Sequence, residues 1–375
     1  MAAPSAFAQR LDARVAQALD NRLVERVGSG SRRRAARALA AVLVTPVHLL
    51  SVVLAVTGIL LLVRGDGWWQ WLMAAFVLGV AWVTRPDVLG RAEPDTVLVA
   101  PPTAPALTDL VAEVAALLGT RPPSEIRVDP HLNAYVAPRG LRNRQLVLGA
   151  PLWVALSPQA RVALLGHELG HLAHGDLLSG QYVGSGYRTL HRWVELLDPV
   201  GSEVFENSTP VLVQAVMAPP RWIVNGYLRL LVAVNAAASR SQELYADLAS
   251  AVVAGTEGAV GCLETSLLAD SVGSAAQRAA LDGRRPDLGE AIAARVATID
   301  AEQRAAARRD AAEDRRSIDD SHPPTADRLR LIESVEPAPA GIVVDSARNG
   351  RIDRELAPGL QQAFKRLGDA YRYVG

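Results

Sequence analysis

Two uncharged apolar runs stand out in the first quarter of the chain. They cover residues 38–63 and 68–83, and a polar turn at residues 64–67 separates them. A helix of about 20 apolar residues crosses the hydrocarbon core of a bilayer, and the second run is slightly shorter than that. Tryptophans at both ends of the second run are typical of a membrane interface. The pattern predicts a transmembrane helical hairpin within residues 35–86, with a buried hairpin of a soluble protein as the alternative.

The placement of arginines predicts how this hairpin is oriented. Four arginines lie within residues 32–37, before the first run, and Arg85 and Arg91 follow the second run, whereas the turn contains only Arg64. Cytoplasmic flanks of membrane helices carry an excess of Lys and Arg. We therefore expect a multi-pass protein of the cell membrane whose remaining domain faces the cytoplasm. Residues 1–34 are amphipathic and lack the apolar core of a signal peptide.

Beyond residue 86 the pattern changes to shorter, mostly helical elements around a few strands. Ser157 and Pro158 are the residue types that cap and begin a helix. The fold class expected is α+β, mainly α with a small β-sheet. The predicted strands are 126–128, 134–136 and 145–148, and the predicted helices include 107–118, 254–297 and 342–374.

Two regions leave alternatives open, and one histidine needs a partner. Residues 211–238 are apolar but are interrupted by two prolines, so they form either a membrane pass or a buried or membrane-leaning helix pair. Residues 301–319 alternate arginine with acidic residues, which predicts an exposed charged helix, with a lid over a cleft as the alternative. His48, inside the first apolar run, is expected to face a neighbouring helix.

Composition excludes some classes of function. The formal net charge is zero, and arginines are not interleaved with aromatic residues, so nucleic acid is not an expected partner. Cys262 is the only cysteine, which excludes a disulfide framework and a thiolate zinc site. It also fits a reducing compartment.

One motif points directly to chemistry. Residues 167–171 read HELGH, an H-E-x-x-H motif, and the residues before it are apolar. On a helix, His167 and His171 lie one turn apart on one face, where two neutral imidazoles can hold zinc. Glu168 lies close enough to take a proton from a water that the metal activates. The alternative is a chance match on a core helix, which leaves three polar side chains without partners.

A third ligand has a candidate further along the chain. Glu243 and Asp247 are also one helical turn apart, among apolar neighbours. Glu243 can supply the third ligand and leave the fourth position for water, as in a catalytic zinc site. Asp247 can accept the free N–H of a ligating histidine, and Asp176 is a second candidate for such a supporting position. The alternative for Glu243 and Asp247 is a solvated helix face.

These motifs, taken with a third one, resemble the M48 zinc metallopeptidases, and among them the membrane-anchored, HtpX-like bacterial members. The motifs are HELGHLAHGD at 167–176, SRSQELYAD at 239–247 and SHPPTADR at 321–328. The resemblance covers about residues 126–332. It implies a zincin-like domain with one Zn²⁺ per chain, held by His167, His171 and Glu243, with Glu168 as the general base.

The resemblance also implies roles near the substrate. The family's H-P-x-x-x-x-R element falls on His322 and Arg328, either of which can stabilise the oxyanion, although an ordinary turn position is the alternative for His322. Asn133, Ala134 and Tyr135 resemble the Asn-Ala-aromatic step that precedes the active-site helix, and are expected to bind substrate. In zinc proteases of this build an edge strand pairs with an extended peptide. Residues 134–136 or 146–148 can be that strand, and interior strands are the alternative.

The sequence thus predicts a membrane-bound zinc metalloendopeptidase that cleaves membrane or misfolded proteins. The expected partners are a polypeptide substrate and the lipid bilayer, and no feature indicates an oligomeric state. Two alternatives stay open: a catalytically silent membrane scaffold or chaperone that keeps the zinc fold, and a zinc hydrolase of a non-peptide bond. The predicted domains are 1–34, 35–86, 87–335 and 336–375.

Overall fold

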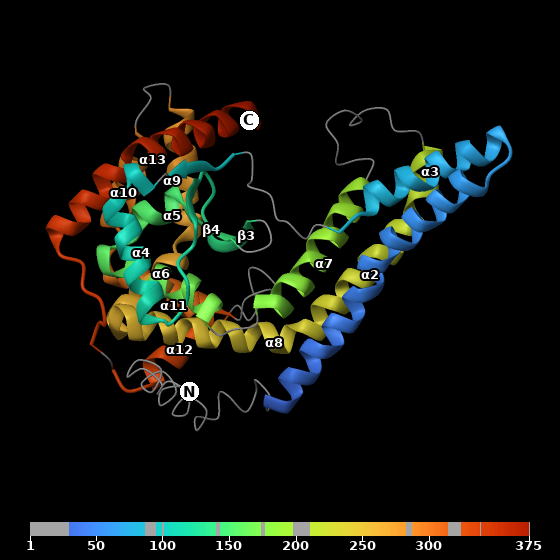
Figure 1. Ribbon diagram of the computed structural model, residues 1–375. Helices are drawn as coiled ribbons and strands as arrows, with labels where there is room; N and C mark the ends of the chain where they lie inside the picture. Colours follow the sequence, from blue (N-terminus) through green and yellow to red (C-terminus); the bar gives the residue numbers. More distant parts are fainter. Residues whose placement is uncertain are drawn as a thin grey trace. The chain divides into compact units, whose positions relative to one another are not determined.

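A computed structural model divides the chain into two compact units (Figure 1). The hairpin unit falls within residues 28–90 and 176–238, and the sheet unit within residues 91–175 and 239–375. The residues that the structure describes are 30–86, 95–99, 101–139, 143–173, 177–197, 211–282, 287–313, 324–337 and 339–374.

The hairpin unit is built from helices. α2 (Gly30–Arg64) and α3 (Trp68–Thr84) form the predicted hairpin. α7 (Leu177–Leu196) and the first part of α8 (Val211–Ser266) complete the unit. α8 is helical through Pro219 and Pro220, so the prolines do not divide this segment into two helices. A proline removes one backbone donor, and the bonds of the flanking turns hold the helix together here.

The interior of the hairpin unit is small and mostly apolar. α2 packs on α7 and α8 through buried Val44, Val47, Leu190 and Leu231. His48 lies beside α7, as expected, with its Nε2 3.0 Å from the Ser185 hydroxyl. The helices of this unit therefore bury one narrow stripe each.

The outward faces of the hairpin remain apolar. Large side chains such as Val42, Phe76 and Trp82 are exposed. By length and composition, two described helical stretches could cross a membrane: Ala38–Arg64, which is 17% buried, and Gln242–Ser266, which is 72% buried. The second stretch belongs to the core of the sheet unit, whereas the first leaves a large apolar surface exposed.

The sheet unit contains a mixed four-stranded sheet, as the predicted α+β class requires. Its strands are β1 (Val97–Val99), β2 (Glu125–Asp129), β3 (Ala134–Arg139) and β4 (Asn143–Gly149), in the order β1-β2-β4-β3. β2 and β4 are parallel, and the two outer pairs are antiparallel. β3 is therefore an edge strand. Residues 146–148 lie inside the sheet, because β4 pairs with β2 on one side and with β3 on the other, and are excluded as the edge strand.

Helices cover this sheet and share one core with it. α6 (Pro158–Ala173) begins where expected, with the Ser157 hydroxyl accepting the Ala160 N–H at 3.3 Å. α11 (Ala301–Glu313) has no buried residue, which confirms the predicted exposed helix over the part described. The other helices are α4 (Pro105–Leu117), α5 (Ala150–Ala155), α9 (Ala269–Leu281), α10 (Leu288–Ala297), α12 (Thr325–Ser334) and α13 (Ser346–Val374).

The C-terminal helix α13 packs into the same core. Ile352, Leu356 and Phe364 are buried at helical spacing. Arg161 of α6 forms an ion pair with Asp353, at 2.6 Å. Residues 346–374, which the sequence placed in a domain of their own at 336–375, therefore brace the helix that carries the H-E-x-x-H motif. The predicted domain boundaries otherwise stay predictions.

Two glycines let α6 and α8 lie unusually close. A Cβ added at Gly166 lies 3.1 Å from the Ser250 Cα, and one added at Gly170 lies 3.1 Å from the Ala246 Cα and 3.0 Å from the Ala249 Cβ. These atoms belong to a helix backbone or to alanine, so no flexible side chain can move away. The close approach brings the motif of α6 against residues 243–250 of α8.

We expect Gly170→Ala to destabilise the protein by about 1–3 kcal/mol, the usual cost of overpacking a core. Gly273→Ala in α9 is the matched control, because no atom lies within 4 Å of its added Cβ. Its higher helix propensity is expected to stabilise that variant by up to about 1 kcal/mol. Denaturant unfolding in detergent solution measures both changes. Equal effects of the two substitutions would argue against a tight contact at Gly170.

Candidate metal centre

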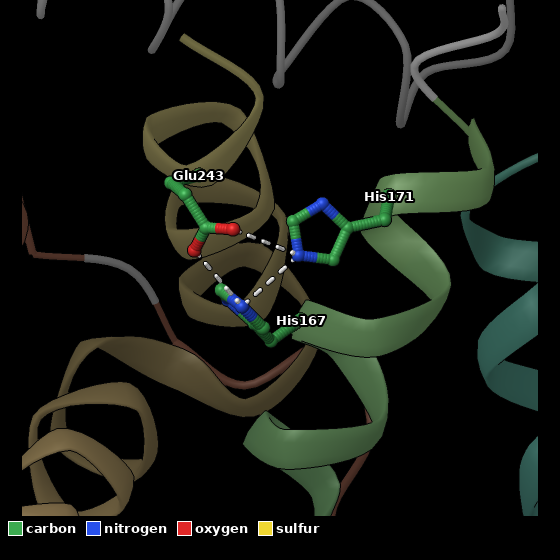
Figure 2. A group of neighbouring side chains, drawn as sticks. All are labelled: His167, His171 and Glu243. Carbon is green, nitrogen blue, oxygen red and sulfur yellow. Dashed lines mark hydrogen bonds and ion pairs between the residues drawn. The ribbon is translucent and has the colours of Figure 1, made fainter. Parts of the chain in front are cut away.

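His167 and His171 of α6 converge on Glu243 of α8 (Figure 2). The two Nε2 atoms are 3.2 Å apart, and Glu243 places Oε2 and Oε1 3.5 Å from the Nε2 atoms of His167 and His171, respectively. Among the residues described, these three form the one group of at least three His, Cys, Asp or Glu side chains with ligand atoms this close.

The separations fit a small tetrahedrally coordinated ion. Ligand atoms about 2.0–2.1 Å from a tetrahedral Zn²⁺ lie about 3.4 Å from one another. The observed distances, between 3.2 and 3.5 Å, match this value. Glu243 and His167 are buried, and a buried carboxylate is costly unless a cation compensates it. The donor set and its burial therefore suit a divalent cation.

Asp247 orients the first of the two histidines. Its Oδ1 lies 3.0 Å from the Nδ1 of His167. Arg328 of α12 donates to both oxygens of the same carboxylate, from Nε to Oδ2 at 2.8 Å and from Nη2 to Oδ1 at 2.7 Å. A His167 Nδ1–H that donates to Asp247 leaves the Nε2 lone pair directed at the metal position.

His167, Asp247 and Arg328 stabilise one another in their charged forms. Burial raises the pKa of the Asp247 carboxyl, but Arg328 and His167 outweigh burial and hold that pKa at about 2. Burial lowers the pKa of His167, but hydrogen bonds with Asp247 and Glu243 overcome it and raise the pKa to about 9. A cation that binds at Nε2 therefore replaces a proton. Asp247 likewise raises the pKa of Arg328, which keeps its charge.

Glu168 lies next to this centre, on the wall of a cavity of about 150 Å³. His167, Asp247 and Arg328 line the same cavity, together with Ala134 at the start of β3. Cys262 also lines it, but burial raises the pKa of its thiol to about 12, so the thiol stays protonated and is a poor metal ligand. A carboxylate, one of the candidate metal ligands and an edge strand thus adjoin one partly open cavity.

Most of the residues predicted from sequence meet at this place. The two histidines, the two glutamates, Asp247 and Arg328 form one cluster. The Asn133 backbone shapes the turn into β3, where its carbonyl accepts the Gly149 N–H at 2.7 Å, and Tyr135 follows in the strand. His322 and Asp176 lie outside the described residues.

Several residues of the site carry no sequence motif. Leu152, Ser250, Leu263 and Ser266 line the cavity, from α5 and from two turns of α8 well beyond Glu243. Nothing in their local sequence marks them. The glycines of α6 did carry a signal, because Gly166 and Gly170 share one helix face.

Comparison with known proteins adds one finding. A sequence profile described as Peptidase family M48 matches residues 101–336. A comparison with individually curated proteins finds no match. The matched region covers more than half of the chain and contains every residue of the cluster described above. The chain therefore belongs to peptidase family M48, a family of metal-dependent peptidases.

Proposed function

We propose that this protein is a membrane-bound zinc metalloendopeptidase. One observation carries the proposal: His167, His171 and Glu243 converge at separations that suit zinc, with Glu168 beside them. A structural zinc site takes four protein ligands, whereas a catalytic site takes three and keeps one position open. No fourth His, Cys, Asp or Glu joins the group within the described residues.

Each residue around the metal position has a separate role in the proposed peptide hydrolysis. A bound zinc ion supplies a Lewis acid that acidifies water and polarises the scissile carbonyl. Glu168 accepts the proton of the attacking water and later donates it to the leaving amine. Asp247 holds the His167 ring in its ligating orientation. The role of His322 near the substrate stays a prediction, because this residue lies outside the described part of the chain.

Arg328 is better placed to position Asp247 than to stabilise an oxyanion. Its Nε and Nη2 groups both donate to the Asp247 carboxylate. The guanidinium thereby keeps the carboxylate ionised and fixed behind His167. We therefore assign Arg328 a positioning role within the proposed mechanism.

The edge strand β3 supports an extended polypeptide as the substrate. The order β1-β2-β4-β3 leaves the outer side of β3 without a strand partner among the described residues. An extended peptide can add to such an edge through backbone hydrogen bonds, with little demand on sequence. Ala134 of β3 and Glu168 line one cavity, so a peptide on this strand passes beside the general base. Misfolded proteins and the loops of membrane proteins, which expose extended segments, fit this mode of binding.

We expect Glu168→Gln to retain zinc and lose peptide hydrolysis by at least about a hundredfold, because an amide cannot act as a base. Zinc content of the detergent-purified protein and cleavage of a casein-type substrate provide the two measurements. His171→Ala serves as the comparison and is expected to lose both zinc and activity. Parental activity in Glu168→Gln would contradict the assigned base. A zinc-loaded parent that cleaves no peptide would instead favour a silent scaffold.

We expect Asp247→Asn to weaken zinc binding by about 10–100-fold, the usual effect of removing the partner of a ligating histidine. The amide also leaves the buried Arg328 charge without its anion. Competition with a chelator of known affinity measures the change. Asp327→Asn is the matched control, because among the described residues the Asp327 carboxylate forms its ion pair with the exposed Arg330, at 2.9 Å. Unchanged zinc affinity in Asp247→Asn would refute the orienting role.

The hairpin unit is proposed to anchor the peptidase in the cell membrane, with both ends of the hairpin in the cytoplasm. The proposal rests on the apolar exposed length of Ala38–Arg64 and on the arginine excess outside the turn. In a Cys262→Ser background, an impermeant maleimide is expected to label Asp66→Cys in intact cells. Gln361→Cys, on the exposed face of α13, is expected to react only after permeabilisation. The opposite pattern would reverse the orientation.

A further inference from the structure

We propose that Gln159 is a positioning residue for the metal centre, and that it acts together with residues 341–353, which lie beyond the region matched by the family profile. Gln159 fixes the angle between α6 and α8, and thereby the spacing of the candidate ligands that the two helices carry. The inference rests on the metallopeptidase function proposed above and adds to it the residues that set the ligand geometry from a distance.

α8 is bent at Gly255, and the C-terminal segment binds directly before the bend. Gly255 has φ 79° and ψ 159°, a backbone conformation that residues with a side chain rarely adopt. Carbonyls in the last turn before such a break lack donors within their own helix. The carbonyls of Val252 and Val253 accept the N–H groups of Gly341 and Ile342, at 3.2 and 2.9 Å. The bend is therefore held by backbone from another part of the chain.

Gln159, in the first turn of α6, connects three segments through one side chain. Its Nε2 donates to the carbonyl of Ala254 at 2.9 Å and to the carbonyl of Ile342 at 2.8 Å. Both partners are acceptors, so the two amide protons of Gln159 are both used here. A Cβ added at Gly258 lies 3.1 Å from the Gln159 Cγ, so the side chain also packs on α8 beyond the bend. The amide thus joins α6 to both sides of the bend and to the C-terminal segment.

Arg161 gives the same end of α6 a second connection to the C-terminal segment. Its Nη1 donates to Asp353 at 2.6 Å and to the Asn349 side-chain oxygen at 3.1 Å. Its Nε donates to the Trp153 carbonyl at 2.9 Å. The start of α6 is therefore fixed by hydrogen bonds from Gln159 and from Arg161.

The position of these bonds along α6 determines what they control. Near the metal position, Gly166 and Gly170 set how closely α6 and α8 approach. This glycine contact spans only about one helical turn, so it constrains the angle between the helices weakly. The bond from Gln159 to Ala254 lies well away from it, and a second contact at a distance fixes the angle.

A small change in this angle is large on the scale of metal coordination. At the helical rise per residue, Gln159 lies about 10 Å from Gly166 along α6, and His171 lies about 7 Å on the other side. If α6 pivots at Gly166, a shift of about 1 Å at Gln159 moves His171 by about 0.7 Å relative to Glu243. Metal–ligand distances tolerate changes of only about 0.2 Å. The bonds at Gln159 therefore act on the ligand geometry without touching the metal.

The test replaces Gln159 with methionine, which has a similar length but no N–H group, in the detergent-purified full chain. Zn²⁺ has a filled d shell, whereas the visible absorption of Co²⁺ in the same site follows its coordination geometry. We expect Gln159→Met to shift the Co²⁺ absorption and to weaken Zn²⁺ binding by at least about tenfold. We also expect kcat to fall by about tenfold or more with little change in KM, because β3 is not displaced. Gln159→Lys, which keeps donors for both carbonyls, is expected to restore most of the Zn²⁺ affinity.

Glu355→Gln is the matched control, because it weakens a contact of the same helix α13 that does not involve α6 or α8. The Glu355 carboxylate accepts the N–H groups of Ala106 and Leu107, at 2.9 and 3.3 Å. We expect this variant to unfold at a lower denaturant concentration and to keep the parental Co²⁺ absorption. Asp353→Asn provides a second variant at the start of α6 if Gln159→Met does not fold. It is expected to shift the Co²⁺ absorption as well.

The measurements separate a positioning role from a purely structural one. A Gln159→Met protein that is less stable but keeps the parental Co²⁺ absorption and Zn²⁺ affinity would overturn the proposal. Equal shifts of the Co²⁺ absorption in Gln159→Met and Glu355→Gln would also overturn it. Neither metal measurement requires peptide cleavage. A parent that binds Zn²⁺ and cleaves no peptide would therefore reject the peptidase function and leave the role of Gln159 standing.

Discussion

The close packing of α6 on α8 is the contact on which the rest of the site depends. Neither helix holds a complete ligand set. α6 contributes two imidazoles, and α8 contributes the carboxylate of Glu243. Gly166 and Gly170 remove the side chains that would separate the two backbones, and Ala246 and Ala249 keep the opposing surface small. Because only small residues separate the two helices, the ligand atoms of His167, His171 and Glu243 lie close enough together to bind one ion.

Burying ionisable groups between the two helices costs free energy, and a third helix, α12, supplies a charge that offsets this cost. Asp247 is buried and would favour the neutral form on its own. Arg328, from α12, donates two hydrogen bonds to it, and His167 lies on its other side. The buried charges therefore alternate in sign. Removing one member leaves the next without compensation, so the metal position depends on a residue that need not touch the metal.

The remaining elements of the sheet unit determine what lies around that position. β3 is at the edge of the sheet, where a polypeptide can pair with it, and β4 is inside. Gly255 bends α8, so residues before and after the bend line one cavity. α13 lies beyond the region matched by the family profile, yet its Asp353 holds Arg161 of the active-site helix. The candidate metal site thus lies beside a cavity lined by α8, and the helix that carries its histidines is held in place by α13.

The sequence by itself determined the features of the metal centre that depend on local geometry. The helix places His167 and His171 one turn apart whatever surrounds them, and the same period pairs Glu243 with Asp247. The apolar length of residues 38–63 predicted a helix able to span a membrane, and short strands among helices predicted the α+β class. These predictions needed only the period of the backbone and the polarity of the side chains.

Only the tertiary structure decided the features that depend on segments far apart in the chain. The outer position of β3 follows from which strands form hydrogen bonds, and alternation along one strand carries no information about its neighbours. The cavity needs the bend at Gly255 and the approach of α5, so Cys262 and Leu263 have no local signal. α13 has buried residues at helical spacing, but from its polar composition one could not predict that it packs on the core of the sheet unit. The residue type fixes the chemistry of a side chain. The surroundings of that side chain depend on helices and strands that come together only when the chain folds.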